Sequence, residues 1–462
     1  MSGGLNWKQR IGKVVNSIFH ILDFLMLGLF LIAFSLFTTV QSESDSWKPF
    51  QLATFQTIDS AKTLTNTNRE DTILYVGWDE VSIVPNKKPF PIAGYGIREW
   101  VSKVRDTTKA RIIYWKQGNV EVAMITLDLL IFPPLLKNKL VEELADKEGI
   151  QCYLSATHTH SAPGGWADRS GGHFLAGQFH PEYLDSIYNQ IISSVKKAKK
   201  TALPTQVAYV SITIPKAVQN RLVGDKGKVD TWLRGLNIKR EDSSQAILFT
   251  YAAHANCLDT HIDSYSGDYP NVLIDSLLHH KYQFATYMAG AVGSHGPHFH
   301  DYNGETNLRL TANAIWDSLS QVKDFQHITS NNKIISYMKV PIYFGESQMR
   351  ISPYFRIRPW VFSSLLGDDQ PTIQAFKVGP IVFLGLPCDY SGEFMEDLQN
   401  VADKYNNEVV VTGFNGGYIG YITPDKYYFL NRGEVRDMNW YGPGNGRYFM
   451  EMNTRIIQKM QK

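Results

Sequence analysis

Two histidines separated by one residue give this sequence its clearest chemical signal. His158 and His160 lie in the stretch THTHSAPGG at positions 157–165. In an extended backbone, residues at i and i+2 point to the same side of the chain. Imidazole is the most common metal ligand near neutral pH. The pair therefore indicates a metal site, and the alternative is a pair of hydrogen-bonded histidines at the start of a loop.

Other candidate ligands follow apolar segments that we expect to be buried strands. Open α/β sheets bind their ligands at the carboxyl ends of the strands, so these residues are predicted to meet in the folded protein. The whole set carries more weight than any single member. The runs and the residues that follow them are 152–154 before His158, 246–253 before His254, 283–289 before Ser294, 381–387 before Asp389 and 409–412 before Tyr421.

Composition indicates a large folded protein. The chain has 462 residues, of which 44% are hydrophobic and 13% aromatic, enough for an extensive core. The net charge is only +2, so nothing in the balance indicates nucleic acid binding. A hairpin is predicted at 111–130, and helices at 134–147 and 181–200. We therefore predict an α/β fold, with mixed β-sheets flanked by helices in a single large catalytic domain.

The N-terminal segment predicts a membrane anchor. Residues 17–40 are almost entirely apolar and follow Lys8, Arg10 and Lys13, which favour a cytoplasmic N-terminus. An uncleaved signal-anchor is the first interpretation, a cleaved signal peptide the second, and a buried helix of a soluble protein the third. With an anchor, residues 1–45 form a cytoplasmic stub, a transmembrane segment and a linker. Residues 46–462 then form a hydrolase domain on the extracytoplasmic side, or a secreted one if the segment is cleaved.

An aromatic segment at 343–366 has two interpretations. It contains several aromatic and aliphatic residues with Arg356 and Arg358 between them. Such a mixture suits a rim that faces a membrane, because aromatic rings and arginines both bind at the headgroup level. The other interpretation is a β-rich core segment with arginines at its edge.

The stretch at 157–165 closely resembles THTHSGPGG, a signature of the neutral ceramidases, which are zinc amidases that split ceramide into sphingosine and a fatty acid. Asn220-Arg221 is similar to the family's NR segment. Pro387-Cys388-Asp389 stands where the family has Pro-Ala-Glu, and YIGYIT at 418–423 is similar to YASYVT. The resemblance covers most of residues 73–450.

The resemblance implies a site for Zn2+ and a division of roles. It implies His158, His254, Asp389 and Tyr421 as metal ligands, with His160 and Arg221 on the substrate side. Asp389 replaces the family's glutamate and can still be a ligand if its backbone lies closer to the metal.

A second departure concerns the family's GDVSPN segment, whose serine has been assigned a catalytic role. That serine aligns with Gly296, and Ser294 lies two residues away. Ser294 is therefore a candidate catalytic residue that needs a different loop shape. A mechanism through zinc-activated water requires no missing residue.

These observations predict a zinc-dependent hydrolase of the amide bond in ceramide or a related N-acyl lipid. Zinc lowers the pKa of a water molecule to about 7. His160 is predicted to carry the proton to the leaving amine, with His295 or His298 as substitutes. Arg221 and Tyr421 are predicted to stabilise the oxyanion. The alternatives are a metallohydrolase of another ester or amide, and a catalytically silent lipid-binding protein. No protein partner is predicted.

Overall fold

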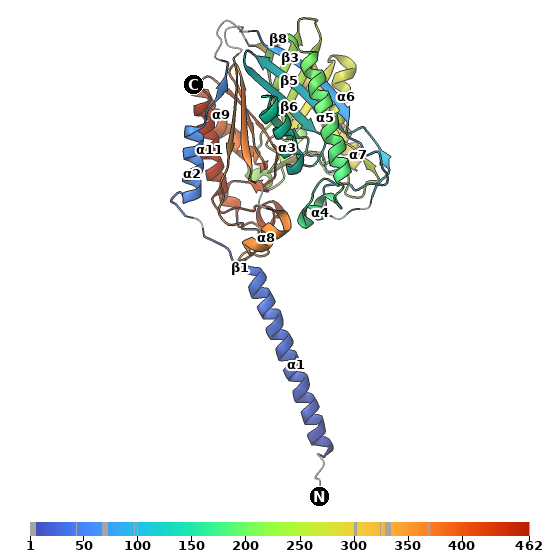
Figure 1. Cartoon of the computed structure of the whole chain (residues 1–462), viewed down its shortest axis with the longest axis vertical. Helices are drawn as coiled ribbons and strands as arrows, with labels where there is room; N and C mark the ends of the chain where they lie inside the picture. The colour runs from blue at the N-terminus through green and yellow to red at the C-terminus, as the bar shows by residue number, and fades with distance from the viewer. Residues whose placement is uncertain are drawn as a thin grey trace.

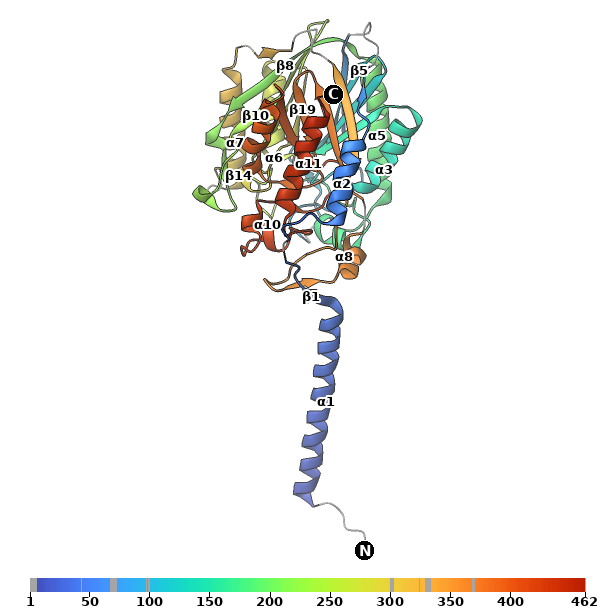
Figure 2. The same cartoon turned by 90° about the vertical axis from the view of Figure 1, so that its left-hand side faces the viewer.

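The computed structural model describes residues 6–42, 44–66, 73–96, 98, 100–299, 303–323, 325–328, 334–367 and 370–461. Two β-sheets pack face to face, and helices cover both outer faces (Figures 1 and 2). The predicted α/β fold with mixed sheets is confirmed.

The larger sheet has nine strands in the order β13-β11-β10-β8-β3-β5-β6-β7, with β15 paired to β8. Most neighbours are antiparallel, but β7 runs parallel to β6 and β13 runs parallel to β11. β5 and β6 form the predicted hairpin. The strands are β3 (Tyr75–Ser82), β5 (Lys109–Gln117), β6 (Val120–Leu127), β7 (Gln151–Ala156), β8 (Leu203–Thr213), β10 (Trp232–Arg240), β11 (Gln245–Tyr251), β13 (Phe284–Ala289) and β15 (Gln326–His327).

The smaller sheet has five strands in the order β2-β16-β18-β19-β21, and only β19 and β21 are parallel. Side chains from both sheets, such as Trp115 and Phe376, form one buried cluster between them. The strands of this layer are therefore apolar on both faces, which explains their continuous hydrophobic runs. They are β2 (Leu64–Thr65), β16 (Ile335–Pro341), β18 (Thr372–Val378), β19 (Ile381–Gly385) and β21 (Glu408–Thr412).

Helices cover the outer faces through three further apolar clusters. The larger sheet is covered by α3 (Pro134–Leu140), α5 (Pro181–Lys200), α6 (Asp268–His280) and α7 (Gly304–Ser320). The smaller sheet is covered by α2 (Pro49–Ser60), α9 (Met395–Asp403) and α11 (Asn445–Lys459). The predicted helix at 181–200 is confirmed, whereas the one predicted at 134–147 is α-helical to Leu140 and continues as a π-helix over Val141–Lys147.

Short elements cover the end of the two packed sheets at which His158 and His254 lie. A bridge between β20 (Asp389–Tyr390) and β22 (Tyr421–Ile422) places Asp389 directly beside Tyr421. β9 (Val218–Asn220) and β14 (His295–Pro297) pair next to Arg221. The segment 164–180 contains helix α4 (Ser170–Ala176). The other short pair is β4 (Lys103–Val104) with β12 (Ser264–Tyr265).

The N-terminal helix α1 (Trp7–Leu36) extends away from the domain (Figure 1). Its segment Arg10–Leu36 is long and apolar enough to cross a membrane, and none of it is buried. This helix fits either a membrane anchor or a signal sequence. Directly after it, β1 (Phe37–Thr39) pairs with β17 (Phe355–Ile357), which precedes helix α8 (Pro359–Leu366).

Candidate metal centre

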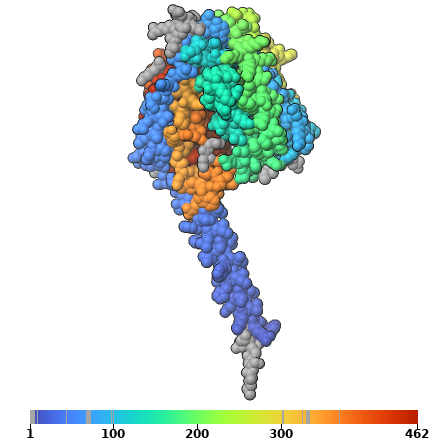
Figure 3. All heavy atoms as spheres, in the orientation of Figure 1, coloured from blue at the N-terminus to red at the C-terminus, as the bar shows by residue number. Residues whose placement is uncertain are grey.

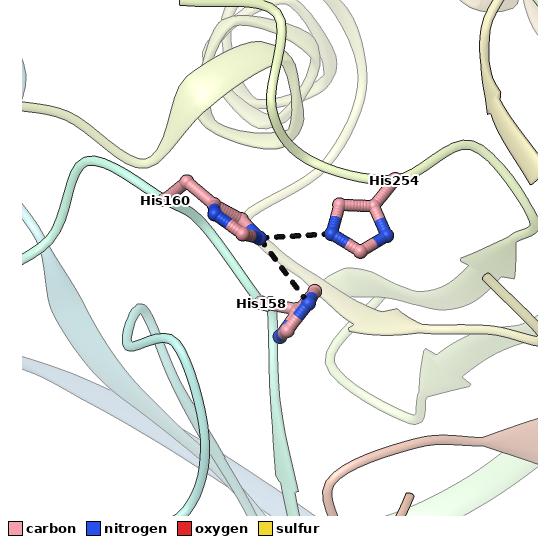
Figure 4. A group of neighbouring side chains, drawn as sticks. All are labelled: His158, His160 and His254. Carbon is pink, nitrogen blue, oxygen red and sulfur yellow. Dashed lines mark hydrogen bonds between the residues drawn. The ribbon is translucent and has the colours of Figure 1, made fainter. Parts of the chain in front are cut away.

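Three histidine side chains converge at the carboxyl ends of β7 and β11 (Figure 4). The Nε2 atom of His160 lies 3.3 Å from Nε2 of His158 and 2.8 Å from Nε2 of His254. Each of the three offers one ring nitrogen within 4.8 Å of the other two. Nitrogens that share a tetrahedral zinc ion at its usual bond length lie roughly 3.3 Å apart. The cluster therefore has donors and spacing that can hold a metal ion.

The backbone that presents His158 is not extended, so that part of the prediction is wrong. β7 ends at Ala156, and His158 adopts a φ of 59°, which is unusual for a residue with a side chain. Its N–H donates to the carbonyl of Leu129. Phe414, with a φ of 61°, stacks on the imidazole at 3.8 Å between ring centroids. Strained backbone of this kind gathers at functional sites.

A hydrogen bond fixes the tautomer of His158. Its Nδ1 atom lies 2.5 Å from the carbonyl oxygen of Leu130, which can only accept. Nδ1 therefore carries the proton, and Nε2 keeps a free lone pair that points at the cluster. Metal-binding histidines are commonly held in this way.

Asp389 approaches the same two histidines that the family resemblance implied as metal ligands. Its Oδ1 atom lies 3.5 Å from Nε2 of His158 and 3.9 Å from Nδ1 of His254. Its other oxygen accepts a 2.7 Å hydrogen bond from the Tyr418 hydroxyl. Oδ1 is fully buried and has no hydrogen-bond partner among the described residues. A buried carboxylate oxygen without a donor requires a proton or a cation, so the residues present fit a bound metal ion.

Burial controls protonation in the centre. It lowers the pKa of His158 to about 3 and holds the pKa values of His160 and His254 well below their usual value. Nearby Arg221 lowers all three further. Burial also raises the pKa of Asp389 to about 7, against the hydrogen bond from Tyr418 and the charge of Arg221. The histidines are therefore neutral near pH 7, as metal ligands must be.

Arg221 lies beside Tyr421 at the edge of the cluster. Its Nη2 atom donates to the Tyr421 hydroxyl at 3.0 Å and lies 3.3 Å from Nδ1 of His254. Burial opposes its charge, but Tyr421, Glu434 and Asp389 together raise the pKa of Arg221 above its usual value. The guanidinium is therefore permanently charged and directed at the centre. The Tyr421 hydroxyl is a partner of Arg221 in this arrangement.

Ser294 does not face the three histidines. It is fully buried, and its hydroxyl lies 2.7 Å from Nδ1 of His295 and 2.6 Å from the hydroxyl of Ser391. Nε2 of His295 accepts from the backbone N–H of Asp230, so both ring nitrogens are engaged. A Cβ atom at Gly296, by contrast, would lie 3.1 Å from Cδ of Arg221. Position 296 therefore faces Arg221, whereas Ser294 faces the interior.

Three aromatic residues support the site without having been predicted from the sequence. Tyr418 bonds to Asp389, Phe414 stacks on His158, and the Tyr95 ring lies 4.6 Å from the His160 ring. Tyr418 begins the YIGYIT stretch, so the resemblance contained a signal for it. Nothing in the sequence singled out Phe414, because its role depends on the packing of two strand ends.

Two cavities adjoin these residues. One of about 430 Å³ borders Arg221, Asn256, Gly296 and Arg432. The other is narrow, at about 120 Å³, and runs behind Tyr418 between α3, α4 and α8, where Trp166, Phe362, Leu366 and Trp440 give it an apolar lining. The first cavity thus adjoins the Arg221 part of the site, and the second adjoins the Tyr418 part.

Comparison with known proteins gives a family-model match over part of the chain and a shared fold. Residues 91–224 match the family model described as neutral/alkaline non-lysosomal ceramidase, N-terminal. A neutral ceramidase from Pseudomonas aeruginosa superposes with a TM-score of 0.71 and 16% identity, over 84% of this chain and 74% of that one. A ceramidase complexed with C2 superposes with a TM-score of 0.71 and 15% identity, over 84% of this chain and 75% of that one. No curated protein matches significantly. The predicted resemblance to the neutral ceramidases is confirmed.

Proposed function

We propose, from the similarity to the neutral ceramidases, that this protein is a membrane-anchored, zinc-dependent amidase that hydrolyses ceramide or a related N-acyl lipid. The observation that carries the proposal is the buried oxygen of Asp389 beside the neutral imidazole of His158. That pair provides a carboxylate and a nitrogen lone pair for one cation, in a fold shared with amide hydrolases.

We assign the metal to His158, His254 and Asp389, with Tyr421 adjoining them. Two groupings are possible. The three histidines meet through their Nε2 atoms. Alternatively, Nε2 of His158 and Nδ1 of His254 lie 3.5 and 3.9 Å from Oδ1 of Asp389. The unpartnered oxygen favours Asp389, because burial penalises its charge and no described residue donates a hydrogen bond to it. Bound zinc would supply Lewis acidity, polarising the amide carbonyl and lowering the pKa of a water molecule.

This assignment leaves His160 to carry the proton. Its ring is only partly buried and lies under Tyr95, and its backbone carbonyl accepts from Arg98 at 2.6 Å. Its pKa, held low by burial, keeps a lone pair available to accept a proton from the attacking water. The same nitrogen then donates that proton to the amine as it leaves.

Arg221 and Tyr421 are assigned to the developing negative charge on the carbonyl oxygen. The guanidinium is charged, buried and already hydrogen-bonded to the phenol, so little reorganisation is needed when the charge appears. Ser294 is assigned a structural role, because its hydroxyl is used by His295 and Ser391.

Membrane attachment is assigned to α1, with residues 46–462 as the extracytoplasmic hydrolase domain. The pairing of Phe37–Thr39 with β17 favours an uncleaved anchor, since cleavage after residue 40 would remove a strand from the folded protein. Topology follows from the basic residues that precede the helix.

One observation favours a second candidate, a lipid-binding protein without turnover. Glycine stands at position 296, which faces Arg221. If catalysis in this fold needs a hydroxyl there, the protein binds its lipid and metal but does not hydrolyse the amide.

The test uses the full-length protein in detergent. We expect about one zinc per chain, release of fatty acid and amine from an N-acylsphingosine, and loss of both after chelation. Hydrolysis of a matched ester but not of the amide would identify another metallohydrolase. Bound zinc without any turnover would identify the lipid-binding protein.

A further inference from the structure

The end of α1 is fastened to the folded domain. β1 and β17 pair in antiparallel register, so that Phe37 faces Ile357 and Thr39 faces Phe355. Two further backbone bonds extend the ladder, from Val40 to Tyr354 and from Arg358 to Leu36. The helix therefore meets the domain through a strand pair, with no free linker between them.

Two arginines reinforce this joint. The Nε atom of Arg358 donates to the carbonyl of Phe34 at 3.0 Å, and its guanidinium lies 5.2 Å from the centre of the Phe34 ring. Arg356 is almost completely buried and donates to the carbonyl of Thr39 and the carboxylate of Glu346. These bonds join the last turn of α1 and the strand after it to the segment 346–358.

The length of α1 places this joint at the membrane surface if the helix spans the bilayer. Lys8, Arg10 and Lys13 would lie at the cytoplasmic side, and residues 14–36, which carry His20 and Asp23 in their cytoplasmic half, would cross the bilayer. At about 1.5 Å per residue they span roughly 34 Å, slightly more than the hydrocarbon core. Because the helix is only slightly longer than the hydrocarbon core and β1 follows it at once, the base of the domain would lie against the bilayer.

The base of the domain carries exposed apolar side chains around this joint. Tyr354 is 76% exposed, Trp360 56%, and Ile351 and Phe355 49% each. With Leu365, at 40%, they form what we call the apolar patch. The orange segment that contains them borders the emerging helix (Figure 3). Clustered exposed apolar side chains mark binding surfaces, and tyrosine and tryptophan are typical of membrane interfaces.

We propose that the apolar patch docks onto the lipid surface of the bilayer that α1 spans, and so fixes the orientation of the catalytic domain. The proposal rests on the membrane anchoring proposed above. Its occupant is a bilayer surface, because the patch is continuous with the spanning helix and includes side chains that suit the headgroup level. The sequence left a membrane rim and a core segment open for 343–366, and the exposure of these residues favours the rim.

Docking would also place the apolar cavity next to the bilayer. Helix α8 presents Trp360 and Leu365 to solvent, while Phe362 and Leu366 line the cavity behind Tyr418. The ring of Phe362 contacts Trp440, and Trp440 contacts Tyr418, which bonds to Asp389. A hydrocarbon chain leaving the bilayer beside α8 would therefore reach the side of the site on which Asp389 lies.

A labelling experiment tests docking without any catalytic readout. The native cysteines Cys152, Cys257 and Cys388 are buried, so an introduced cysteine is labelled selectively. Full-length Tyr354→Cys and Trp360→Cys, each carrying a polarity-sensitive fluorophore, are reconstituted into phosphatidylcholine vesicles that contain spin-labelled lipid. The matched control is Lys239→Cys. Lys239 is an exposed residue of β10 that pairs with Gln245 at the end of β11 remote from His254.

We expect the labels at 354 and 360 to shift to shorter wavelength and to be quenched about threefold more than the label at 239. Equal quenching at all three positions would overturn the proposal. A Tyr354→Ser/Trp360→Ser variant should lose about tenfold in turnover of vesicle lipid and stay within about twofold on a short-chain substrate in detergent. If the labels dock but the unsubstituted protein hydrolyses nothing, the proposed function fails and docking stands.

Discussion

The Oδ1 atom of Asp389 lies 3.5 Å from Nε2 of His158, and both atoms are buried without a donor between them. Because burial lowers the pKa of His158 to about 3, the imidazole is neutral and the contact is not an ion pair. Two acceptors facing each other in a buried site are unfavourable unless a cation or a proton lies between them. Each assignment at the centre depends on this contact.

Asp389→Asn should remove metal and leave the metal-free fold intact. The amide is nearly isosteric and places no charge in the buried site, so the metal-free variant should melt no lower than the unsubstituted metal-free protein. The zinc content should fall below about a tenth of that of the unsubstituted protein, since an amide is a much weaker ligand than a carboxylate. Metal analysis and thermal melting with chelator check both parts, and full zinc occupancy would show that Asp389 is not a ligand.

His160→Ala and His158→Ala should both lose activity, but only His158→Ala should also lose zinc. We expect His158→Ala to lose both zinc and activity, whereas His160→Ala keeps most of its zinc and loses about 10²-fold or more in turnover. The measurements are zinc content and the turnover number in detergent. Loss of zinc from both variants would make His160 a ligand and assign the metal to the three-histidine group.

The sequence predicted that the candidate residues lie at strand ends, because the apolar run that marks each strand is a local feature of the sequence. Each ligand follows a short apolar run, and parallel pairs such as β11 with β13 and β19 with β21 bring their carboxyl ends to the same edge. The predicted neighbours His158, His254 and Asp389 follow β7, β11 and β19, which come from both sheets, so their proximity also depends on how the two sheets pack. Their roles as ligands remain predictions.

The details that orient the site could not be predicted because they depend on contacts between distant segments. The left-handed backbone of His158 is held by Leu129 and by the ring of Phe414, which comes from the other sheet. Helix α4 lies in a glycine-rich segment with low intrinsic helix propensity. It forms against α8, where a Cβ atom at Gly171 would lie 2.8 Å from the Leu366 side chain.

Ser294→Ala should behave as a structural substitution. It leaves Nδ1 of His295 and the hydroxyl of Ser391 without their partner, which costs about 1–3 kcal/mol of stability. Zinc content should be unchanged and turnover reduced by less than about tenfold. Turnover as low as that of His158→Ala would contradict the water mechanism and assign a catalytic role to Ser294.

Arg221→Lys should lower turnover without removing the metal. Lysine keeps the charge but cannot contact Tyr421 and His254 with one planar group, as the guanidinium does at 3.0 and 3.3 Å. Loss of one oxyanion donor costs about 10²-fold or more in turnover. The expected pattern is a reduced turnover number with little change in KM and full zinc occupancy. Loss of zinc would instead show that Arg221 mainly orients His254.

Stability of the metal-free protein should fall as the pH drops below about 6.5. The unfolded histidines bind protons in that range, whereas His158 in the folded protein does not until about pH 3, and His160 and His254 follow the same direction. Each histidine therefore removes about 1.4 kcal/mol per pH unit on acidification. Asp389 acts in the opposite sense, because its pKa of about 7 exceeds the unfolded value, so its contribution falls as the pH rises.

Three histidines outweigh one carboxyl group, so the net effect of this centre is loss of stability on acidification. Denaturant unfolding of the full-length protein in detergent and chelator, at several pH values between 6.5 and 4.5, measures the slope. His158→Gln removes one of the buried titrating groups and should reduce that slope by about one proton, or roughly 1.4 kcal/mol per pH unit. Equal slopes for the two proteins would show that His158 is already protonated in the folded state, and a protonated imidazole could not bind the metal assigned to it.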